Sequence, residues 1–239
     1  MKLNKIYNED CLETMAKMPN DFIDLIVTSP PYEDFTGAGY AGKSKDILFL
    51  KLYSEFIDKV FNSYFRILKN TGQIYFNVKS KTFQKQLNTP HWFEFLESFN
   101  KFKLKSYIIW KYSGSFDSTN KRFHLDYEII YHLSKTDDIY LNTNSSYDDP
   151  LSSVWYVPHY IKKEDRLHPT QMPVKLSDKI LDLSAKENYT IYDSFMGVGT
   201  TAISCLKKGL NYIGSEINIK NYNLANERIK KFKLQTKMF

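Results

Sequence analysis

The chain has 239 residues, of which 42% are hydrophobic and 25% charged, with a formal net charge of +6 at pH 7. This length allows one large domain with a sizeable core, and the apolar content excludes a disordered protein. No window approaches about 18 consecutive apolar residues and the start MKLNKIYNED has no signal-peptide core, so we expect a cytoplasmic protein with no membrane partner. The distant Cys11 and Cys205 argue against a disulfide framework or a zinc site.

Apolar runs of strand length alternate along the chain with longer segments of helical periodicity. This alternation is typical of an α/β protein with a mainly parallel sheet. The first part of the chain predicts a strand at 3–8, a short helix at 11–18, a strand at 22–27, a glycine-containing loop at 33–45, a helix at 46–68, a strand at 73–78 and a helix at 91–99.

The second part of the chain ends in a compact strand-loop-helix-strand-helix unit. Periodicity is weak between the middle strands and this unit, so we expect a single domain over 1–239 with an insertion at about 134–166. A helix should follow, with Pro173 in its first turn. The predicted elements are strands at 106–111 and 127–133, a helix at 173–185, a strand at 189–192, a helix at 200–208, a strand at 211–215 and a helix at 219–233.

The positive charge is concentrated in the middle of the chain. Between Phe61 and Leu125 there are 11 Lys and Arg against 3 Asp and Glu, a net of +8 that exceeds the +6 of the whole chain. Aromatic residues are interleaved with these charges, and a basic, aromatic-rich surface suits the backbone of a nucleic acid. An ordinary lysine-rich surface has the same composition, so this pattern alone leaves both interpretations open.

The stretch IYDSFMGVGTT, residues 191–201, is a glycine loop between a predicted strand and a predicted helix. Gly197 and Gly199 allow the backbone to pass close to a ligand, and the helix start offers free N–H groups. No Gly-Lys-Ser/Thr follows, which excludes a Walker loop. The next strand ends at Glu216, about 20 residues after the loop, where a nucleoside ribose finds its hydroxyl acceptor. A simple turn is the alternative for the glycines alone, whereas the whole pattern predicts an adenosine-type cofactor.

Asp193, at the mouth of this loop, indicates which adenosine cofactor is meant. A carboxylate at this position repels a pyrophosphate but can engage an ammonium group. This favours a cofactor with an amino-acid end and no phosphate, and S-adenosylmethionine fits that description.

Three motifs together carry a resemblance to a known family: TSPPY at 28–32, RLHPTQMP at 166–173 and DSFMGVGTT at 193–201. The chain resembles the amino-methyltransferases of DNA, most closely the permuted β-class of restriction–modification systems. The resemblance covers nearly the whole chain. It implies a Rossmann-like class I methyltransferase with a mainly parallel seven-stranded sheet flanked by helices, a circularly permuted motif order and a small target-recognition insertion. Met172 stands where the family commonly has Lys, so no role is transferred to that side chain.

The resemblance also assigns contacts with S-adenosylmethionine and its product S-adenosylhomocysteine, and it implies no metal. Glu216 would hold the ribose hydroxyls, and Asp10 would contact the adenine amino group. Two local interpretations remain beside these: Asp10 is also placed to cap the helix at Cys11, and His168 is also an ordinary loop residue before proline. The expected cofactor-binding residues are Asp10, His168, Thr170, Gln171, Asp193, Phe195, Gly197, Gly199, Thr200 and Glu216.

The same family places the catalytic motif at Ser29, Pro30, Pro31 and Tyr32. The exocyclic amine of cytosine or adenine is a poor nucleophile because its lone pair is delocalised into the ring. Ser29 Oγ and the Pro30 carbonyl can accept hydrogen bonds from its two N–H groups. Pro31 stiffens the turn that presents these two acceptors. Tyr32 offers a ring on which a base flipped out of the duplex can stack.

The choice of base depends on association within the family. Forms with Ser before the two prolines go mainly with cytosine N4 and forms with Asp mainly with adenine N6, so we expect N4-cytosine, with N6-adenine as the alternative. Methylation of RNA or of a glutamine amide is a more distant alternative, because Asn is typical there in place of Ser29. A catalytically inactive DNA-binding module is the alternative from another class.

Duplex DNA is the expected substrate, and the family implies two further partners, a cognate restriction endonuclease and a second copy of the chain. In the family, the polar loop between the strands at 106–111 and 127–133 lies beside the flipped base. The insertion at about 134–166 occupies the usual place of the target-recognition region. The expected DNA-binding residues are Lys111, Lys121, Arg122, Phe123, Lys162, Lys163 and Arg166.

Overall fold

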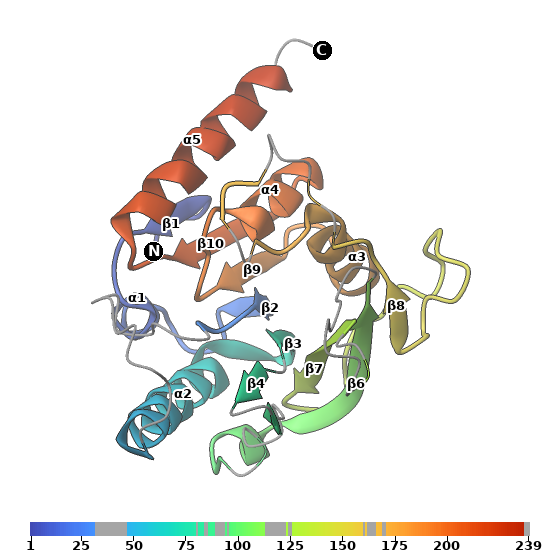
Figure 1. Ribbon diagram of the computed structural model, residues 1–239. Helices are drawn as coiled ribbons and strands as arrows, with labels where there is room; N and C mark the ends of the chain where they lie inside the picture. The colour runs from blue at the N-terminus through green and yellow to red at the C-terminus, as the bar shows by residue number, and fades with distance from the viewer. Residues whose placement is uncertain are drawn as a thin grey trace.

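Figure 1 shows the chain in a computed structural model, in which helices cover both faces of a large twisted sheet. The expected α/β class is confirmed. The loop expected at 33–45 lies outside the described residues, as do residues 91–93 and 95 of the helix expected at 91–99. The structure describes residues 1–31, 47–79, 81–83, 86–88, 94, 96–112, 123, 126–159, 161, 166–168 and 171–236.

Within these residues the main sheet has eight strands in the order β1–β10–β9–β2–β3–β7–β6–β8. The five strands from β1 to β3 are parallel, β7 is antiparallel to β3 and β6, and β8 is parallel to β6. Parallel neighbours need long crossovers, which explains why strands and helices alternate in the sequence. The strands are β1 (Lys5–Tyr7), β2 (Ile23–Thr28), β3 (Leu68–Val78), β6 (Lys103–Lys111), β7 (Tyr127–Ser134), β8 (Val154–Tyr156), β9 (Thr190–Asp193) and β10 (Asn211–Ser215).

Helices cover both faces of the sheet and create two apolar cores. The first two helices pack around Ile26 on one face, and the last three pack around Leu25 and Val27 on the other. These three consecutive residues thus point alternately to the two cores, as expected for a strand that is buried on both sides. The helices are α1 (Cys11–Ala16), α2 (Ile47–Ile67), α3 (Val174–Ser184), α4 (Thr200–Lys207) and α5 (Ile219–Gln235). No helix in the described ranges is long and apolar enough to cross a bilayer.

Strand β8 lies inside the segment that we expected to be an insertion, and it adds one strand to the expected seven. Pairing with β6 and the buried Trp155 side chain, whose ring lies 6.3 Å from that of Tyr75, hold it to the domain. A strand of three residues has too little periodicity to be detected in a sequence. The prediction of 134–166 as a target-recognition segment stays a prediction.

Other differences concern short or irregular elements. Strand β3 begins at Leu68, directly after α2, where we expected a turn, and its pairing with β2 shifts register before Leu25. Two three-residue strands, β4 (Lys81–Phe83) and β5 (Gln86–Asn88), form a separate hairpin that we did not predict. The helix expected at 91–99 is not formed over 96–98, which are irregular and turn residues, and a 3₁₀ helix follows over Phe99–Lys101.

Gly199 offers a test of how the last helix packs on the glycine loop. It has a φ of +83°, and an added Cβ would lie 3.1 Å from Cβ of Ala225 in α5, whereas Gly209 has a φ of +65° and open space. We expect Gly209→Ala to cost about 1 kcal/mol for its backbone alone and Gly199→Ala to cost more in denaturant unfolding. Ala225→Gly should recover part of the Gly199→Ala loss. Equal losses for the two alanine variants would contradict the steric argument.

Candidate functional site

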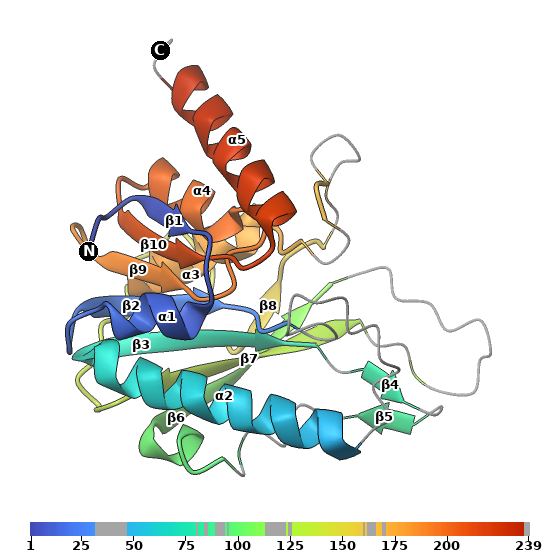
Figure 2. The same cartoon turned by 90° about the vertical axis from the view of Figure 1, so that its left-hand side faces the viewer.

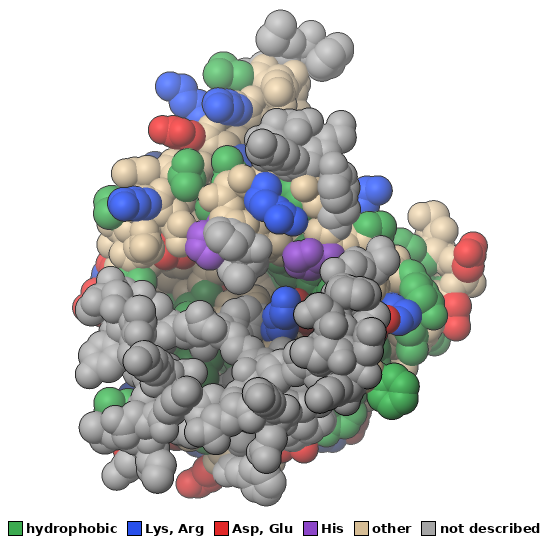
Figure 3. Space-filling model, viewed as in Figure 1, with side chains coloured by type: hydrophobic (Ala, Val, Ile, Leu, Met, Phe, Trp, Pro, Cys, Tyr) green, Lys and Arg blue, Asp and Glu red, His purple; other side chains and the backbone are tan. Residues whose placement is uncertain are grey.

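The candidate site lies along one edge of the sheet, where four neighbouring parallel strands end. Their lateral order is β1, β10, β9 and β2, and parallel strands present their carboxyl ends at the same edge (Figures 1 and 2). Strand β1 leads to Asp10, β10 to Glu216, β9 ends at Asp193 and β2 leads to Ser29. Figure 3 shows histidine and basic side chains on the face of the molecule that is turned toward the viewer in Figure 1. Four residues predicted from separate motifs thus come to one edge.

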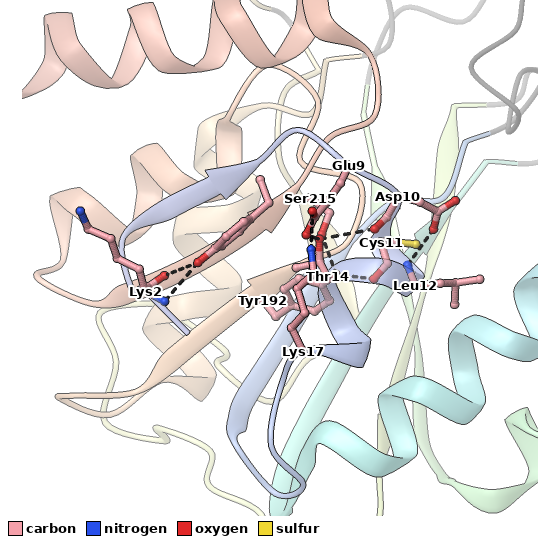
Figure 4. Close-up of polar contacts among 10 residues, drawn as sticks. Lys2, Glu9, Asp10, Cys11, Leu12, Thr14, Lys17, Tyr192 and Ser215 are labelled. Carbon is pink, nitrogen blue, oxygen red and sulfur yellow. Dashed lines mark hydrogen bonds and ion pairs between the residues drawn. The ribbon is translucent and has the colours of Figure 1, made fainter.

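Asp10 caps helix α1, as its position in the sequence predicted. Its Oδ1 accepts a hydrogen bond from the Leu12 N–H at 2.7 Å, and its side chain remains half-buried (Figure 4). The helix start is tied to the sheet by the Tyr192 hydroxyl, which bonds with Ser215 Oγ at 2.8 Å and donates to the Cys11 carbonyl at 3.5 Å. The cap uses one oxygen of a half-buried carboxylate, so capping and cofactor contact are compatible.

Glu216 directly follows β10 and holds the backbone of the neighbouring loop. Its Oε2 accepts from the Gly197 N–H at 2.8 Å and its Oε1 from the Asn218 N–H at 2.7 Å. Burial raises the pKa of this carboxyl, and the two backbone hydrogen bonds oppose the rise. The structure therefore brings the acidic residue against the glycine loop.

Asp193 is almost fully buried at the end of β9. Its Oδ1 accepts from Thr28 Oγ1 at 2.8 Å and from the Phe195 N–H at 3.1 Å, and its Oδ2 accepts from Thr201 Oγ1 at 2.6 Å. All three donors are neutral, and within the described part of the chain this carboxylate forms no ion pair. Burial consequently raises its pKa from 3.8 to about 6, although the three hydrogen bonds lower it.

The glycine loop turns sharply between β9 and α4. Gly197 and Gly199 have φ values of +54° and +83°, which residues with a Cβ rarely adopt, and Gly199 is the N-cap of α4. Thr200, the first residue of the helix, donates from Oγ1 to the Met172 carbonyl at 3.2 Å. Phe195 is half-buried, with its ring 6.1 Å from that of Phe56. The expected loop geometry is present.

The HPTQ motif is stabilised by hydrogen bonds within the segment and by one hydrogen bond from the helix that follows the glycine loop. The Leu167 N–H donates to Gln171 Oε1 at 2.8 Å, and the Gln171 N–H donates to the His168 carbonyl at 3.2 Å. The Thr200 contact with Met172 joins the end of the motif to the start of α4. The end of the motif at Met172 thus lies beside the start of α4, and Thr170 lies outside the described residues.

Ser29, Pro30 and Pro31 form the turn after β2, and this turn is fixed on both sides. Thr28, the last residue of the strand, bonds with Asp193 and also with Ser194 Oγ at 3.2 Å. The Tyr53 hydroxyl of α2 donates to the Pro31 carbonyl at 2.8 Å. Ser29 itself is half-buried. Tyr32, expected to stack on the base, lies outside the described residues.

Three of the expected DNA-binding residues are described. Lys111, at the end of β6, pairs with Asp126. The Phe123 side chain is 98% exposed, and Arg166 is exposed. Lys121, Arg122, Lys162 and Lys163 lie outside the described residues, so a DNA-binding role for this set stays a prediction.

The buried residues that hydrogen-bond with the site from inside the core were not predicted from the sequence. They lie in three separate elements and in the glycine loop itself: Thr28 in β2, Tyr64 in α2, Thr201 in α4 and Ser194 in the loop. Thr28 and Ser194 adjoin predicted site residues and were detectable as neighbours. Tyr64 had no such signal, because its spacing in α2 is that of any core residue. In the described ranges no three His, Cys, Asp or Glu side chains gather as ligands for a metal ion.

Comparison with known proteins gives matches over nearly the whole chain. A family model for N6/N4 methyltransferases, described as DNA methylase, matches residues 23–227. The Type II methyltransferase M.BglII of Bacillus subtilis is 28% identical over 93% of this chain and 68% of its own length. The DNA adenine methyltransferase YhdJ of Escherichia coli (strain K12) is 26% identical over 94% of this chain and 82% of its own.

Two solved structures have a similar fold. The PvuII DNA methyltransferase (cytosine-N4-specific) superposes with a TM-score of 0.80 at 15% identity, covering 95% of this chain and 90% of its own. TTHA0409 of Thermus thermophilus, in complex with S-adenosyl-L-methionine, gives 0.73 at 20% identity, covering 95% and 93%. These matches and the observed topology define a class I methyltransferase fold. Because the family model spans most of the chain, the protein belongs to the N6/N4 DNA methylase family.

Asp193→Asn tests the buried carboxylate through the pH dependence of stability. The pKa of Asp193 is raised in the folded chain, so its favourable contribution is complete below pH 4 and is lost as pH rises through about 6. Two pKa units correspond to about 3 kcal/mol. We expect the variant to gain up to this free energy of unfolding relative to the wild type between pH 4 and pH 7, measured by urea unfolding. Parallel stability curves over this range would show that Asp193 titrates normally.

Proposed function

We propose that the protein transfers a methyl group from S-adenosylmethionine to the exocyclic N4 amine of a cytosine flipped out of duplex DNA. Family membership supports methylation of DNA on an exocyclic amine. The similarity to M.BglII, a Type II methyltransferase, supports a place in a restriction–modification system. The base, the cofactor contacts and the individual site residues belong to this proposal.

The order of residues along the sheet edge carries the proposal. From β1 through β10 and β9 to β2, the strands lead to Asp10, Glu216, Asp193 and Ser29. The assigned partners are adenine, ribose, the methionine moiety and the methyl acceptor. The first three follow the order along an extended cofactor, and the acceptor would approach the sulfonium methyl group between ribose and methionine. Three strand spacings cover about 14 Å. A cofactor lying across the strand ends would therefore meet each assigned residue in turn.

The side chains at this edge fit a cofactor with a positive methionine end. Asp193 and Glu216 are buried carboxylates with raised pKa, and neither has a cationic partner in the described part of the chain. A cation near them would favour their ionised forms. When bound, S-adenosylmethionine supplies a methyl group on a sulfonium sulfur. TTHA0409, which has a similar fold, was solved with this molecule.

Ser29, Pro30 and Pro31 form what we call the acceptor turn, which supplies hydrogen-bond acceptors for an amine whose delocalised lone pair makes it a poor nucleophile. Ser29 Oγ and the Pro30 carbonyl would accept hydrogen bonds from the two N–H groups of the amine. This would direct the nitrogen lone pair at the methyl group. As the new N–CH₃ bond forms, the S–CH₃ bond breaks and its electron pair stays on sulfur. The methylated nitrogen then loses one proton to solvent, and no strong base is needed. Fixed acceptors lower the barrier by orientation and electrostatics.

Adenine N6 is the second candidate for the target. It is favoured by the similarity to YhdJ, a DNA adenine methyltransferase. Ser29 before the prolines, and the fold shared with the cytosine-N4-specific PvuII enzyme, favour cytosine. In either case the DNA would lie across the sheet edge, near Lys111, exposed Phe123 and Arg166. We include Lys121, Arg122, Lys162 and Lys163 in this surface because of their charge and their place in the sequence.

Incubation with labelled S-adenosylmethionine and unmethylated DNA tests the function directly. Mass spectrometry of the nucleosides should find 4-methylcytosine, whereas 6-methyladenine would establish the alternative, and label only in RNA or protein would reject both. Ser29→Ala should lower the rate at least about a hundredfold, because it removes one of the two acceptors. Ser63→Ala, a half-buried serine on α2, is the control and should retain activity. An active Ser29→Ala would reject the assigned mechanism.

Glu216→Gln tests the cofactor assignment without a DNA substrate. The glutamine has one acceptor oxygen for the Gly197 and Asn218 N–H groups and cannot also hold two ribose hydroxyls. We expect the dissociation constant of S-adenosylmethionine, measured by calorimetry, to rise at least tenfold. Glu13→Gln, at an exposed position on α1, should leave it unchanged. Unaltered binding by Glu216→Gln would remove this residue from the site.

A further inference from the structure

One face of helix α2 contacts two parts of the candidate site, the glycine loop and the turn after β2. The Tyr64 hydroxyl bonds with Ser194 Oγ in the glycine loop, the Phe56 ring lies 6.1 Å from Phe195, and the Tyr53 hydroxyl donates to the Pro31 carbonyl at 2.8 Å. The two tyrosines are eleven residues apart, which is about three helical turns and about 16 Å along the axis. They therefore share a face of the helix and reach two different parts of the site.

The hydrogen bonds around Tyr64 form a chain with one direction. Thr28 Oγ1 donates its only proton to Asp193 Oδ1, so at its 3.2 Å contact with Ser194 it must accept. Ser194 has thereby used its proton and must accept from the Tyr64 hydroxyl. Burial raises the pKa of Tyr64 well above its usual value, so this phenol keeps its proton. The chain runs from Tyr64 through Ser194 and Thr28 to Asp193, and every member is buried.

This chain of hydrogen bonds joins the acceptor turn to the cofactor loop. Thr28 directly precedes Ser29, and Ser194 lies between Asp193 and Phe195 at the start of the glycine loop. The chain thus fixes the strand side of the turn against the loop assigned to the methionine moiety. Linked hydroxyls polarise one another, which strengthens each bond in a buried setting.

Tyr53 fixes the outer side of the same turn. The ring of Pro31 holds its φ, so ψ is its remaining backbone freedom. The hydrogen bond from Tyr53 to the Pro31 carbonyl restrains that angle. Ser29 and Pro30 therefore lie between two anchors, the Thr28 hydroxyl on one side and the Pro31 carbonyl on the other.

We propose that Tyr53 and Tyr64 of α2 are positioning residues for methyl transfer, which hold the acceptor turn in register with the cofactor loop. The inference rests on the proposed function in one respect, the assignment of Ser29 and Pro30 as the acceptors of the amine. Within the described residues, Tyr53 bonds with Pro31 and Tyr64 with Ser194. Each acts through a residue next to the acceptors or in the cofactor loop.

Phenylalanine variants test the proposal, because each removes one hydroxyl and keeps the ring. We expect Tyr53→Phe to lower kcat at least tenfold and to change the dissociation constant of S-adenosylmethionine less than twofold. Tyr64→Phe should lower kcat and also weaken cofactor binding, because Ser194 loses its donor. The control is Tyr75→Phe, which removes the 2.5 Å bond to Ser184 in the other core and should leave kcat unchanged. Equal kcat values in all three variants would reject the proposal.

Two further measurements separate this inference from the proposed function and from loss of folding. Thr28→Ser keeps the hydroxyl and should retain activity, whereas Thr28→Val has a similar shape without it and should lose at least tenfold in kcat. Hydrogen exchange of the peptide with Thr28 and Ser29 should be faster in Tyr53→Phe and Tyr64→Phe than in the wild type. Wild-type exchange rates in both would reject the positioning role even if the protein methylates DNA. A wild-type protein that methylates no DNA would reject the proposed function, and exchange would still decide whether the tyrosines hold the turn.

Discussion

The bonding of the buried Asp193 carboxylate is the interaction on which the site depends. One oxygen accepts from Thr28 at the end of β2, and the other accepts from Thr201 in α4. Strand β2, strand β9 and helix α4 are thereby held at one point. Burial of an anion among neutral donors is costly, as its raised pKa shows. The cost is offset in part by these bonds, and a positively charged ligand beside it would offset it further.

The parallel sheet then determines where the other groups lie. Four adjacent strands end at one edge and lead to the four residues that the proposal assigns to successive parts of the cofactor and the substrate. The helices place these endings, because α1 is capped by Asp10 and α4 begins at Gly199. The precision of the acceptor turn has a different origin. It depends on α2, whose tyrosines reach across the core to the two loops that must meet.

Much of this architecture could be predicted from local patterns. The strands at β2, β9 and β10 and the long helices matched because each has a clear apolar period and a recognisable start or stop signal. Strand β8 and the hairpin of β4 and β5 were missed because a strand of three residues carries only a weak period; β1, which is equally short, was predicted, but with the longer bounds 3–8. The start of β3 at Leu68 was missed because Leu68 pairs with Ile23 ahead of a register shift, and the turn-forming Asn-Thr-Gly sequence lies within that shift, before pairing resumes at Gln73.

The sequence by itself determined the residue types and their spacing: the acceptor turn at Ser29, the glycine loop after Asp193 and the acid at Glu216. Local chemistry suffices there, because a proline fixes its own φ and a glycine permits its own turn. Only the tertiary structure decided which groups face each other. That Tyr64 reaches Ser194, and that Asp193 bonds with Thr28 across 165 residues, follows from strand order and helix packing. No short stretch of the chain encodes these contacts.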